Sequence, residues 1–340
     1  MRRGLGLLGG AGFTLVELLL VMGIIGVMLG TGLGMVASLN PAERTAIGLV
    51  QSTIRAANNS AIASSAPARV LLDTKAGTLR AESMQVVGTW RFDTEDLSGA
   101  FGHTGSIRGA AGTLLGEAGY RGKCLDFVGT PRSSRVEFGV SEDPAFNPRL
   151  GFHVEVAVKL AGYAATTLMD MGGVLLVEVG PRGELAATFV AEAVGETGAR
   201  AKGPRIALRT GAGALRLERW SRVSISYDRR FLVLAVDGVE LARRPETAGL
   251  WRIHAPLSLS GGAVPFPGAL DELVISVVAA SETFTLAGGV QFGADAPGEI
   301  LFVPGGGLDP TFHRGALTIP LEFLDGYVEE VRVGRYGTVE

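Results

Sequence analysis

One long apolar segment near the N-terminus constrains this chain more than any other feature. Residues 13–36 form a run of 24 residues whose only charged side chain is that of Glu17. As an α-helix this run would be about 36 Å long, enough to cross the hydrocarbon core of a bilayer. A charged side chain inside such a segment costs about 2.5–3.5 kcal/mol on insertion scales, so it usually marks a function. The sequence therefore predicts a transmembrane helix over 13–36 in which Glu17 has a role.

Two other interpretations of this segment explain less. A secretory signal would have a basic start, which Arg2 and Arg3 supply. However, the apolar run is too long for a signal sequence, and no small-x-small cleavage site follows it. Alternatively, Glu17 lies in the first turn, where the partial positive charge of a helix N-terminus tolerates an acid. That explanation leaves the junction between Gly12 and Phe13 without a reason.

The ten residues from Gly12 to Val21, G-F-T-L-V-E-L-L-L-V, resemble the N-terminal motif of type IV pilins and type II secretion pseudopilins. The resemblance implies that residues 1–12 are a leader and that a prepilin peptidase cuts between Gly12 and Phe13. It also implies that Phe13 is N-methylated. In an assembled filament Glu17 would pair with the N-terminal amine of a neighbouring Phe13, so that two costly charges satisfy each other.

Length and composition indicate the domain number and the fold class of the chain beyond residue 36. The chain has 340 residues, enough for about two domains besides the anchor. Its formal net charge is −3 and its basic residues are not clustered, so we expect no nucleic-acid partner. Hydrophobic residues make up 47% and charged residues 19% of the chain, and 50 residues are glycine. Such a composition favours an all-β body with many tight turns.

Cysteine and histidine give no sign of metal or redox chemistry. Cys124 is the only cysteine, which excludes an intrachain disulfide. It stands on a predicted strand before Leu125, where we expect a buried small hydrophobe and not a nucleophile. The four histidines lack the spacing of metal ligands, and they are His103, His153, His254 and His313.

A helix and a hairpin are predicted after the anchor. Asn40 is a helix N-cap residue, Pro41 suits the first helical position, and Glu43 occupies the capping-box site. The helix should end before Pro67. Apolar residues at spacings of three and four then predict one core-facing stripe, made of Ile47, Val50, Ile54, Ala57 and Ala61.

Residues 69–73 and 78–80 read as two strands joined by a turn. The order of anchor, amphipathic helix and hairpin is similar to that of the H-type minor pseudopilins. This resemblance assigns residues 37–85 to a pseudopilin helix and first hairpin.

Residues 86–281 change character and resemble a laminin-G-like, concanavalin A-like jelly roll. Short predicted strands separated by glycines replace the helical pattern. Six phrases of the jelly-roll pattern recur in order, at 90–92, 119–127, 152–159, 220–228, 232–238 and 266–275.

Residues 282–340 resemble the last strands of an H-type pseudopilin, at 298–306, 316–321 and 328–337. We therefore favour a jelly roll inserted into a small antiparallel pseudopilin sheet, since insertions are tolerated at exposed loops whose ends lie close together. In the rival interpretation, residues 325–331 echo a jelly-roll closing strand and the tail is a second lectin-like fragment.

The acidic residues of the predicted jelly roll decide between catalysis and binding. Glycoside hydrolases of this superfamily need two carboxylates on one face of a strand. Asp271 and Glu272 are adjacent, so their side chains should point to opposite faces. Glu137, Glu142 and Asp143 lie in a turn-rich stretch without a matching acid. The sequence thus favours a binding domain and predicts no enzyme.

Calcium is the one cofactor that the pattern suggests. Related jelly rolls often bind it through a D-x-S-G-N-G loop, and in the corresponding stretch here, residues 96–102, Ala100 replaces the asparagine. Calcium takes six to eight oxygen ligands, so a lost ligand weakens the site. Asp96 is the candidate ligand, and the alternative is that Asp96 only caps a turn.

The predicted fold is thus an N-terminal transmembrane α-helix and a mainly-β body, with a β-sandwich inserted into a pseudopilin sheet. The resemblance implies a minor pilin-like subunit of a type II secretion or type IV pilus-like filament. It would span the bacterial inner membrane once, with its body in the periplasm. Its partners would be the prepilin peptidase, other pilin subunits, and a glycan or secreted protein bound by the jelly roll. One alternative is a membrane-anchored carbohydrate-binding adhesin, and a less favoured one is a glycoside hydrolase.

Overall fold

The computed structural model describes residues 15–16, 18–25, 41–109, 114–139, 148–195, 199–253, 255–261 and 264–340. Residues 15–16 and 18–25 are helical and exposed. No helix within the described ranges is both long and apolar enough to cross a membrane. The predicted leader, the sites at Gly12, Phe13 and Glu17, and much of the predicted transmembrane helix lie outside these ranges.

The first part of the body, which we call the stem, is one helix packed on two small sheets. The helix α2 (Pro41–Ser64) begins and ends close to the predicted limits. It buries Val50, Ile54, Ala57 and Ala61, four residues of the predicted stripe, against the sheets. The stem strands are β1 (Ala68–Asp73), the start of β2 (Thr78–Trp90), β17 (Phe284–Thr285), β18 (Val290–Phe292), β19 (Glu299–Phe302), β20 (Leu317–Phe323) and β21 (Val328–Val333).

The stem combines residues from both ends of the described body. β1 pairs with β2 on one side and with β19 on the other, and β17 pairs with the start of β2. The strands β18, β20 and β21 form a separate three-stranded antiparallel sheet, and α2 also contacts this sheet. Residues 325–331, which echo a jelly-roll strand, lie in the β20–β21 turn and β21.

The second part, which we call the head, is a sandwich of two antiparallel sheets. The first sheet has the order β14-β13-β12-β7-β16-β2 and the second has the order β11-β10-β9-β8-β15-β6-β3. The first-sheet strands are β7 (Phe152–Leu160), β12 (Trp220–Tyr227), β13 (Phe231–Val236), β14 (Val239–Pro245) and β16 (Gly268–Ala280), with β4 (Leu115–Gly116) and β5 (Cys124–Asp126) beside β16. The second-sheet strands are β3 (Gly105–Arg108), β6 (Arg135–Phe138), β8 (Thr166–Met171), β9 (Leu175–Val179), β10 (Leu185–Val194), β11 (Arg200–Arg209) and β15 (Leu257–Leu259), and a 3₁₀ turn, η3, spans Pro148–Leu150.

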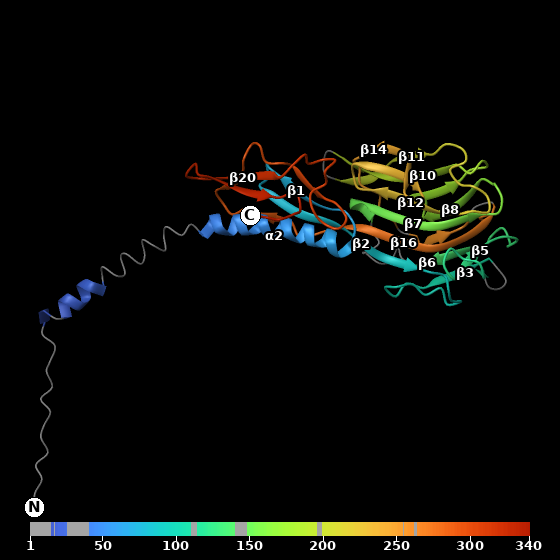
Figure 1. Ribbon diagram of the computed structural model, residues 1–340, viewed down its shortest axis with the longest axis horizontal. Coiled ribbons are helices and arrows are strands. Elements are labelled where there is room, and N and C mark those ends of the chain that lie inside the picture. The colour runs from blue at the N-terminus through green and yellow to red at the C-terminus, as the bar shows by residue number, and fades with distance from the viewer. Residues whose placement is uncertain are drawn as a thin grey trace, which may run out of the picture.

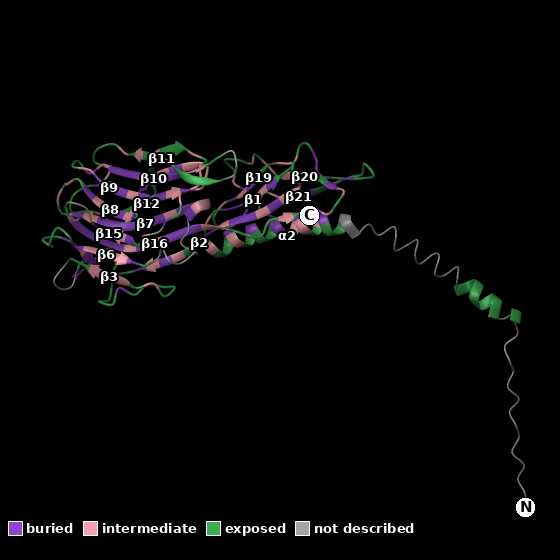
Figure 2. Cartoon of the chain, turned by 180° about the vertical axis from the view of Figure 1, so that it is seen from behind, coloured by how far each residue is buried: buried purple, intermediate pink, exposed green. Residues whose placement is uncertain are grey.

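Alternating side chains explain why these segments form a sandwich. In β7 the valines at 154, 156 and 158 are buried, whereas His153 and Glu155 are only half-buried. Period-two burial of this kind places one strand face in the core and the other toward solvent. Figure 2 shows the buried residues following the strands of both sheets. The predicted mainly-β body is confirmed.

Two long strands join the head to the stem without a break. β2 pairs with β1 from Thr78 to Ser83, and with β16 from Glu82 to Trp90. The predicted domain boundary at 85–86 therefore lies inside one continuous strand. In Figure 1, β2 and β16 run from the stem into the head. The two parts have separate hydrophobic cores but share one sheet.

Candidate functional site

Asp96 lies in the loop after β2, where its carboxylate caps a turn. Its Oδ1 accepts hydrogen bonds from Thr94 Oγ1 at 2.5 Å and from the Ser98 amide at 3.4 Å. These hydrogen bonds lower the pKa of Asp96. No group of three or more His, Cys, Asp or Glu side chains suited to a metal occurs within the described ranges. The geometry of Asp96 is that of the capped turn weighed as the alternative to calcium binding.

Asp271 is completely buried, and backbone amides hold its carboxylate. Oδ2 accepts from the Arg121 amide at 2.9 Å and Oδ1 accepts from the Glu272 amide at 2.8 Å. Burial raises its pKa to about 6, and these backbone hydrogen bonds oppose that rise. Glu272 follows at a β-bulge with a φ of 49°. Asp271 therefore fastens the 119–127 loop to β16, and it has no access to a substrate.

The thiol of Cys124 is buried as the sequence predicts, 3% exposed beside Gly116. Burial raises its pKa to about 11, and Asp126 and Asp271 add to the effect. A thiol with such a raised pKa is inert as a nucleophile.

The outer face of the second sheet carries a cross-strand row of seven residues, five of which are polar. Directly paired residues on neighbouring strands share a face. The register makes one row of Ser106, Glu137, Ser258, Asp170, Leu176, Thr188 and Ala207. The strand neighbours Phe138, Leu257 and Met169 are buried, so the row itself faces outward. No local sequence pattern indicates this row, because it depends on the pairing of strands that lie far apart in the chain.

Glu137 and Asp170 are the acids of this row, and β15 separates their strands. Two strand spacings put their backbones about 10 Å apart. Arg135 Nε donates to Glu137 Oε1 at 2.7 Å and Arg108 Nε donates to Oε2 at 3.1 Å. The bond from Arg135 has the largest effect, and together the two arginines lower the pKa of Glu137. A glycosidase acid needs a raised pKa, which this carboxylate does not have.

A shallow hollow of about 440 Å³ lies on the same face, toward one end of the sheet. Thr167, Glu178, Ala186 and Arg209 form a cross-strand row through it. The small side chain of Ala186 leaves the space between the acid on β9 and the base on β11. The hollow thus offers one carboxylate, one guanidinium and one hydroxyl group to a ligand.

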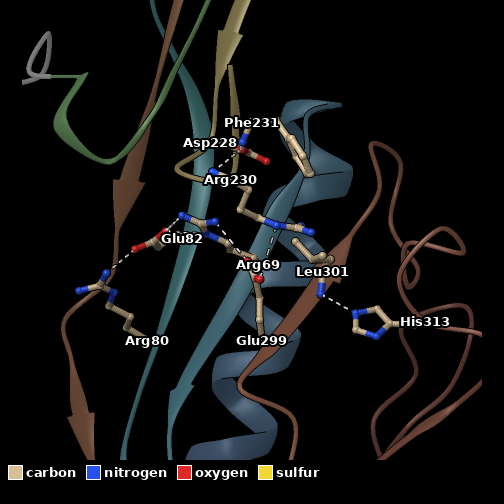
Figure 3. A network of polar contacts seen from close by, with 9 residues as sticks. All are labelled: Arg69, Arg80, Glu82, Asp228, Arg230, Phe231, Glu299, Leu301 and His313. Atoms are coloured by element: carbon tan, nitrogen blue, oxygen red, sulfur yellow. Dashed lines mark hydrogen bonds and ion pairs between the residues drawn. The ribbon is translucent and has the colours of Figure 1, made fainter. Parts of the chain in front are cut away.

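A network of buried charges occupies the joint between head and stem. Arg69 on β1 donates to Glu82 Oε2 through Nε at 2.7 Å, and Nη1 donates to Glu299 Oε1 at 3.1 Å. Arg80 Nη2 lies 2.7 Å from Glu82 Oε1. The side chain of Glu82 is 0% exposed. Figure 3 shows Arg69 between the two glutamates. A buried carboxylate needs such partners, because an unpaired charge in the interior is strongly destabilising.

The head reaches into this network through the turn between β12 and β13. Asp228 Oδ1 accepts from the amides of Arg230 and Phe231 at 2.9 and 2.8 Å, which shapes the turn. Arg230 Nε then lies 3.8 Å from Glu299 Oε2, and its guanidinium carbon lies 3.6 Å from the ring centroid of Phe312. The turn of the head is thereby attached to Glu299 of β19, as Figure 3 shows, and also to Phe312 in the 309–313 segment of the stem.

No protein-family model matches the chain, and no curated protein matches it. Several solved structures match part of the chain. Domain 4 of the arabinanase AbnA from Geobacillus stearothermophilus, solved with arabinotriose, is 19% identical, with a TM-score of 0.41 over 58% of this chain and 95% of that one. The binding domain of Paraclostridial Mosquitocidal Protein 1 is 10% identical, with a TM-score of 0.44 over 56% of this chain and 48% of that one. The binding domain of Botulinum Neurotoxin DC, solved with SialylT, is 9% identical, with a TM-score of 0.39 over 56% of this chain and 47% of that one.

Proposed function

We propose that this chain is a pilin-like subunit whose stem displays a β-sandwich head. In this proposal the segment over 13–36 anchors the chain in the bacterial inner membrane, and the body faces the periplasm. The prepilin peptidase cuts after Gly12, Phe13 becomes N-methylated, and Glu17 directs the subunit into a type II secretion or type IV pilus-like filament. The head then carries out binding and not hydrolysis.

The observation that carries this proposal is how the stem is built. One hydrophobic core combines α2 and β1 with Phe292, Phe302 and Val333, which lie more than 200 residues further along the chain. The head has its own core, and the part of the sequence that runs from β2 to β16 forms it. A helix and small sheet with a core of their own suit an assembling subunit, because the stem can pack against its neighbours while the head projects from it.

The charged joint supports a display role. A head on a flexible linker would sample many orientations, whereas β2, β16 and the Arg69 network hold this head in one orientation. A fixed head presents the same faces to its surroundings in each subunit. The outer faces of both sheets then become the candidate binding surfaces.

Processing and assembly are tested separately. Intact mass of the membrane-extracted protein is expected to show cleavage after Gly12 and one methyl group on Phe13. Glu17→Ala is expected to leave membrane insertion intact while lowering recovery in sheared filaments at least tenfold. Glu330→Ala, which changes an exposed acid of β21, is the matched control and should be recovered like the wild type. An unprocessed N-terminus, or equal recovery of Glu17→Ala and wild type, would overturn the assembly proposal.

A membrane-anchored carbohydrate-binding protein is the second candidate function. The observation that favours it is the polar row of hydroxyl and carboxylate groups across the second sheet, since saccharides offer matching donors and acceptors. This candidate predicts glycan binding by the full chain and no entry into filaments. Binding to a glycan array together with filament recovery separates the two functions.

A further inference from the structure

A cleft of about 450 Å³ lies where the end of α2 meets the outer face of the first sheet. Residues 64–67, at and after the C-terminal end of α2, form one wall, and Phe231 of β13 stands on the head side. This volume is within the range of about 300–1,000 Å³ that ligand pockets have, and junctions between domains are frequent places for them. Figure 1 shows α2 running along the stem toward the head.

The floor of the cleft is a single cross-strand row over six strands. The register joins Arg243, Val233, Ser226, His153, Ser276 and Val86, in the order β14-β13-β12-β7-β16-β2. All six line the cleft. Because directly paired residues share a face, Ser226 and Ser276 flank His153 at neighbouring strand positions, about 5 Å apart each.

These three central side chains have no hydrogen-bond partner among the described residues. Ser276 is only 5% exposed, and it lines the cleft. Burial lowers the pKa of His153, while Glu155 raises it and Arg222 lowers it further. His153 is therefore neutral at pH 7, with one nitrogen that donates and one that accepts. The buried Ser276 and the half-buried His153 and Ser226 thus present unused hydrogen-bond donors and acceptors to the cleft.

The fixed charges around the floor are already paired. Arg243 Nη2 donates to Glu240 Oε2 at 2.7 Å, and its guanidinium lies 4.7 Å from the ring centroid of Phe231. In the next row, Arg222 pairs with Glu155. Asp228 Oδ1 is engaged by the two turn amides. Among the residues that line the cleft, Arg243 is the one arginine or lysine, and its pairing with Glu240 leaves no free cation there for a phosphate or a carboxylate.

Three ligand classes fit poorly. An apolar ligand would leave the hydroxyls and the imidazole desolvated and unpaired, at about 1–3 kcal/mol each. An anion lacks a free cation. An extended peptide needs a strand edge, whereas the backbone groups of this floor are engaged in the ladder of the sheet. A neutral ligand with many hydroxyls and some apolar surface matches the hydroxyl–imidazole–hydroxyl line between two valines.

We propose that the cleft between α2 and the first sheet of the head binds a neutral saccharide, with Ser226, His153 and Ser276 as its hydrogen-bonding floor. This inference rests on the ligand-binding role of the head and does not depend on filament assembly. Val86 and Val233 lie at opposite ends of this line, about 19 Å apart, so each contacts the apolar face of a different sugar ring of an oligosaccharide, and Phe231 borders the site.

The test uses the full chain in detergent micelles. It is exposed to neutral hexasaccharides of glucose, xylose, mannose and N-acetylglucosamine, and to sialyllactose and oligogalacturonate as acidic probes. The strongest neutral binder is then titrated calorimetrically. Ser276→Ala and Ser226→Ala are each expected to weaken binding about 5- to 10-fold, and His153→Phe at least 10-fold. Ser224→Ala is the matched control, because Ser224 is on the same face of β12 but outside the cleft, and its affinity should equal that of the wild type.

Two other results would each overturn the proposed saccharide site. Binding only to the acidic probes, or to none, contradicts the neutral-saccharide class. Unchanged affinity in Ser276→Ala and Ser226→Ala, with a loss in Thr188→Val, moves the site to the second sheet. In both cases the processing and filament experiments stand by themselves, so failure of the cleft and failure of the assembly proposal are distinguishable. Circular dichroism of each variant confirms that a loss does not come from unfolding.

Discussion

Glu82 shows at the scale of single residues how much this fold depends on a few charges. Its side chain is fully buried and lies against Arg69 and Arg80. Such a cluster is expensive to bury, and its stabilisation depends on every partner being present. Nothing local in the sequence around Arg69 indicates that it meets Glu299 on a strand 230 residues later.

Arg69→Met should lower the free energy of unfolding by about 3–5 kcal/mol, since it leaves the carboxylate of Glu82 buried with one partner fewer. Urea denaturation measures the change. Arg332→Met, which removes an exposed pair with Glu330, should cost less than about 1 kcal/mol. Adding Glu82→Gln to Arg69→Met should recover part of the loss, and a further loss in the double variant would contradict this explanation.

His313 covers the free edge of β19. Its Nε2 accepts the Leu301 amide at 3.0 Å, so the imidazole must be neutral in the folded state. Burial lowers the pKa of His313 and Arg230 lowers it further, whereas Asp309 and Glu299 raise it. A folded pKa below the unfolded one means that the unfolded chain binds more protons. The stability from His313 is therefore present above about pH 6.5 and is lost as the pH falls below it.

His313→Gln tests this linkage. We expect the wild type to lose more unfolding free energy than the variant between pH 7 and pH 5, because glutamine offers an acceptor that does not titrate. Denaturation curves at several pH values give the difference between the two proteins. Parallel pH profiles would show that the Leu301 contact does not depend on the protonation of His313.

At the scale of elements, α2 was the most predictable part of the described chain. Its N-terminal signals and the spacing of its apolar residues act within the helix, so they are visible without the fold. Ile47 is the exception in the predicted stripe, since it is only half-buried. The head strands were predictable as strands, but their neighbours in the sheets were not, because pairing joins residues far apart in the chain.

Ile54→Ala should lower the free energy of unfolding by about 2–5 kcal/mol, since Ile54 is 0% exposed in the stem core and the truncation leaves a cavity. Ile62 on the same helix is 50% exposed, so Ile62→Ala is the matched control and should cost clearly less. Thermal and urea denaturation measure both variants. Equal losses would contradict the orientation of α2 on its sheets.

At the scale of the whole molecule, the shared sheet makes head and stem one body. The pairing of β2 with β16 from Trp90 to Glu82 continues directly into the pairing of β2 with β1. A hinge at this place would break ladder hydrogen bonds that contribute about 0.5–1.5 kcal/mol each. The Arg230 contacts with Glu299 and Phe312 add a second attachment beside the sheet.

Spin labels at Arg44→Cys on α2 and Arg216→Cys on the head should therefore give one narrow distance distribution by pulsed electron resonance. Both positions are exposed, and the buried Cys124, whose raised pKa keeps it as a thiol, remains unlabelled. Arg230→Ala in the labelled protein should broaden the distribution without moving its centre, because the paired strands remain. A broad or two-peaked distribution in the parent would contradict a fixed joint.

The sequence by itself determined the features that local physics encodes: the apolar run over 13–36, the helix α2, the alternating strands, and the buried state of Cys124. Each depends on residues within one element, whose period or composition is read directly. Only the tertiary structure decided the register that brings Ser226, His153 and Ser276 into one floor, Glu137 and Asp170 into one row, and Arg69 between Glu82 and Glu299. The residues of each contacting pair are separated by 13 to 230 positions in the sequence. A shift of one residue in the pairing of any strand would turn its side chains to the opposite face of the sheet.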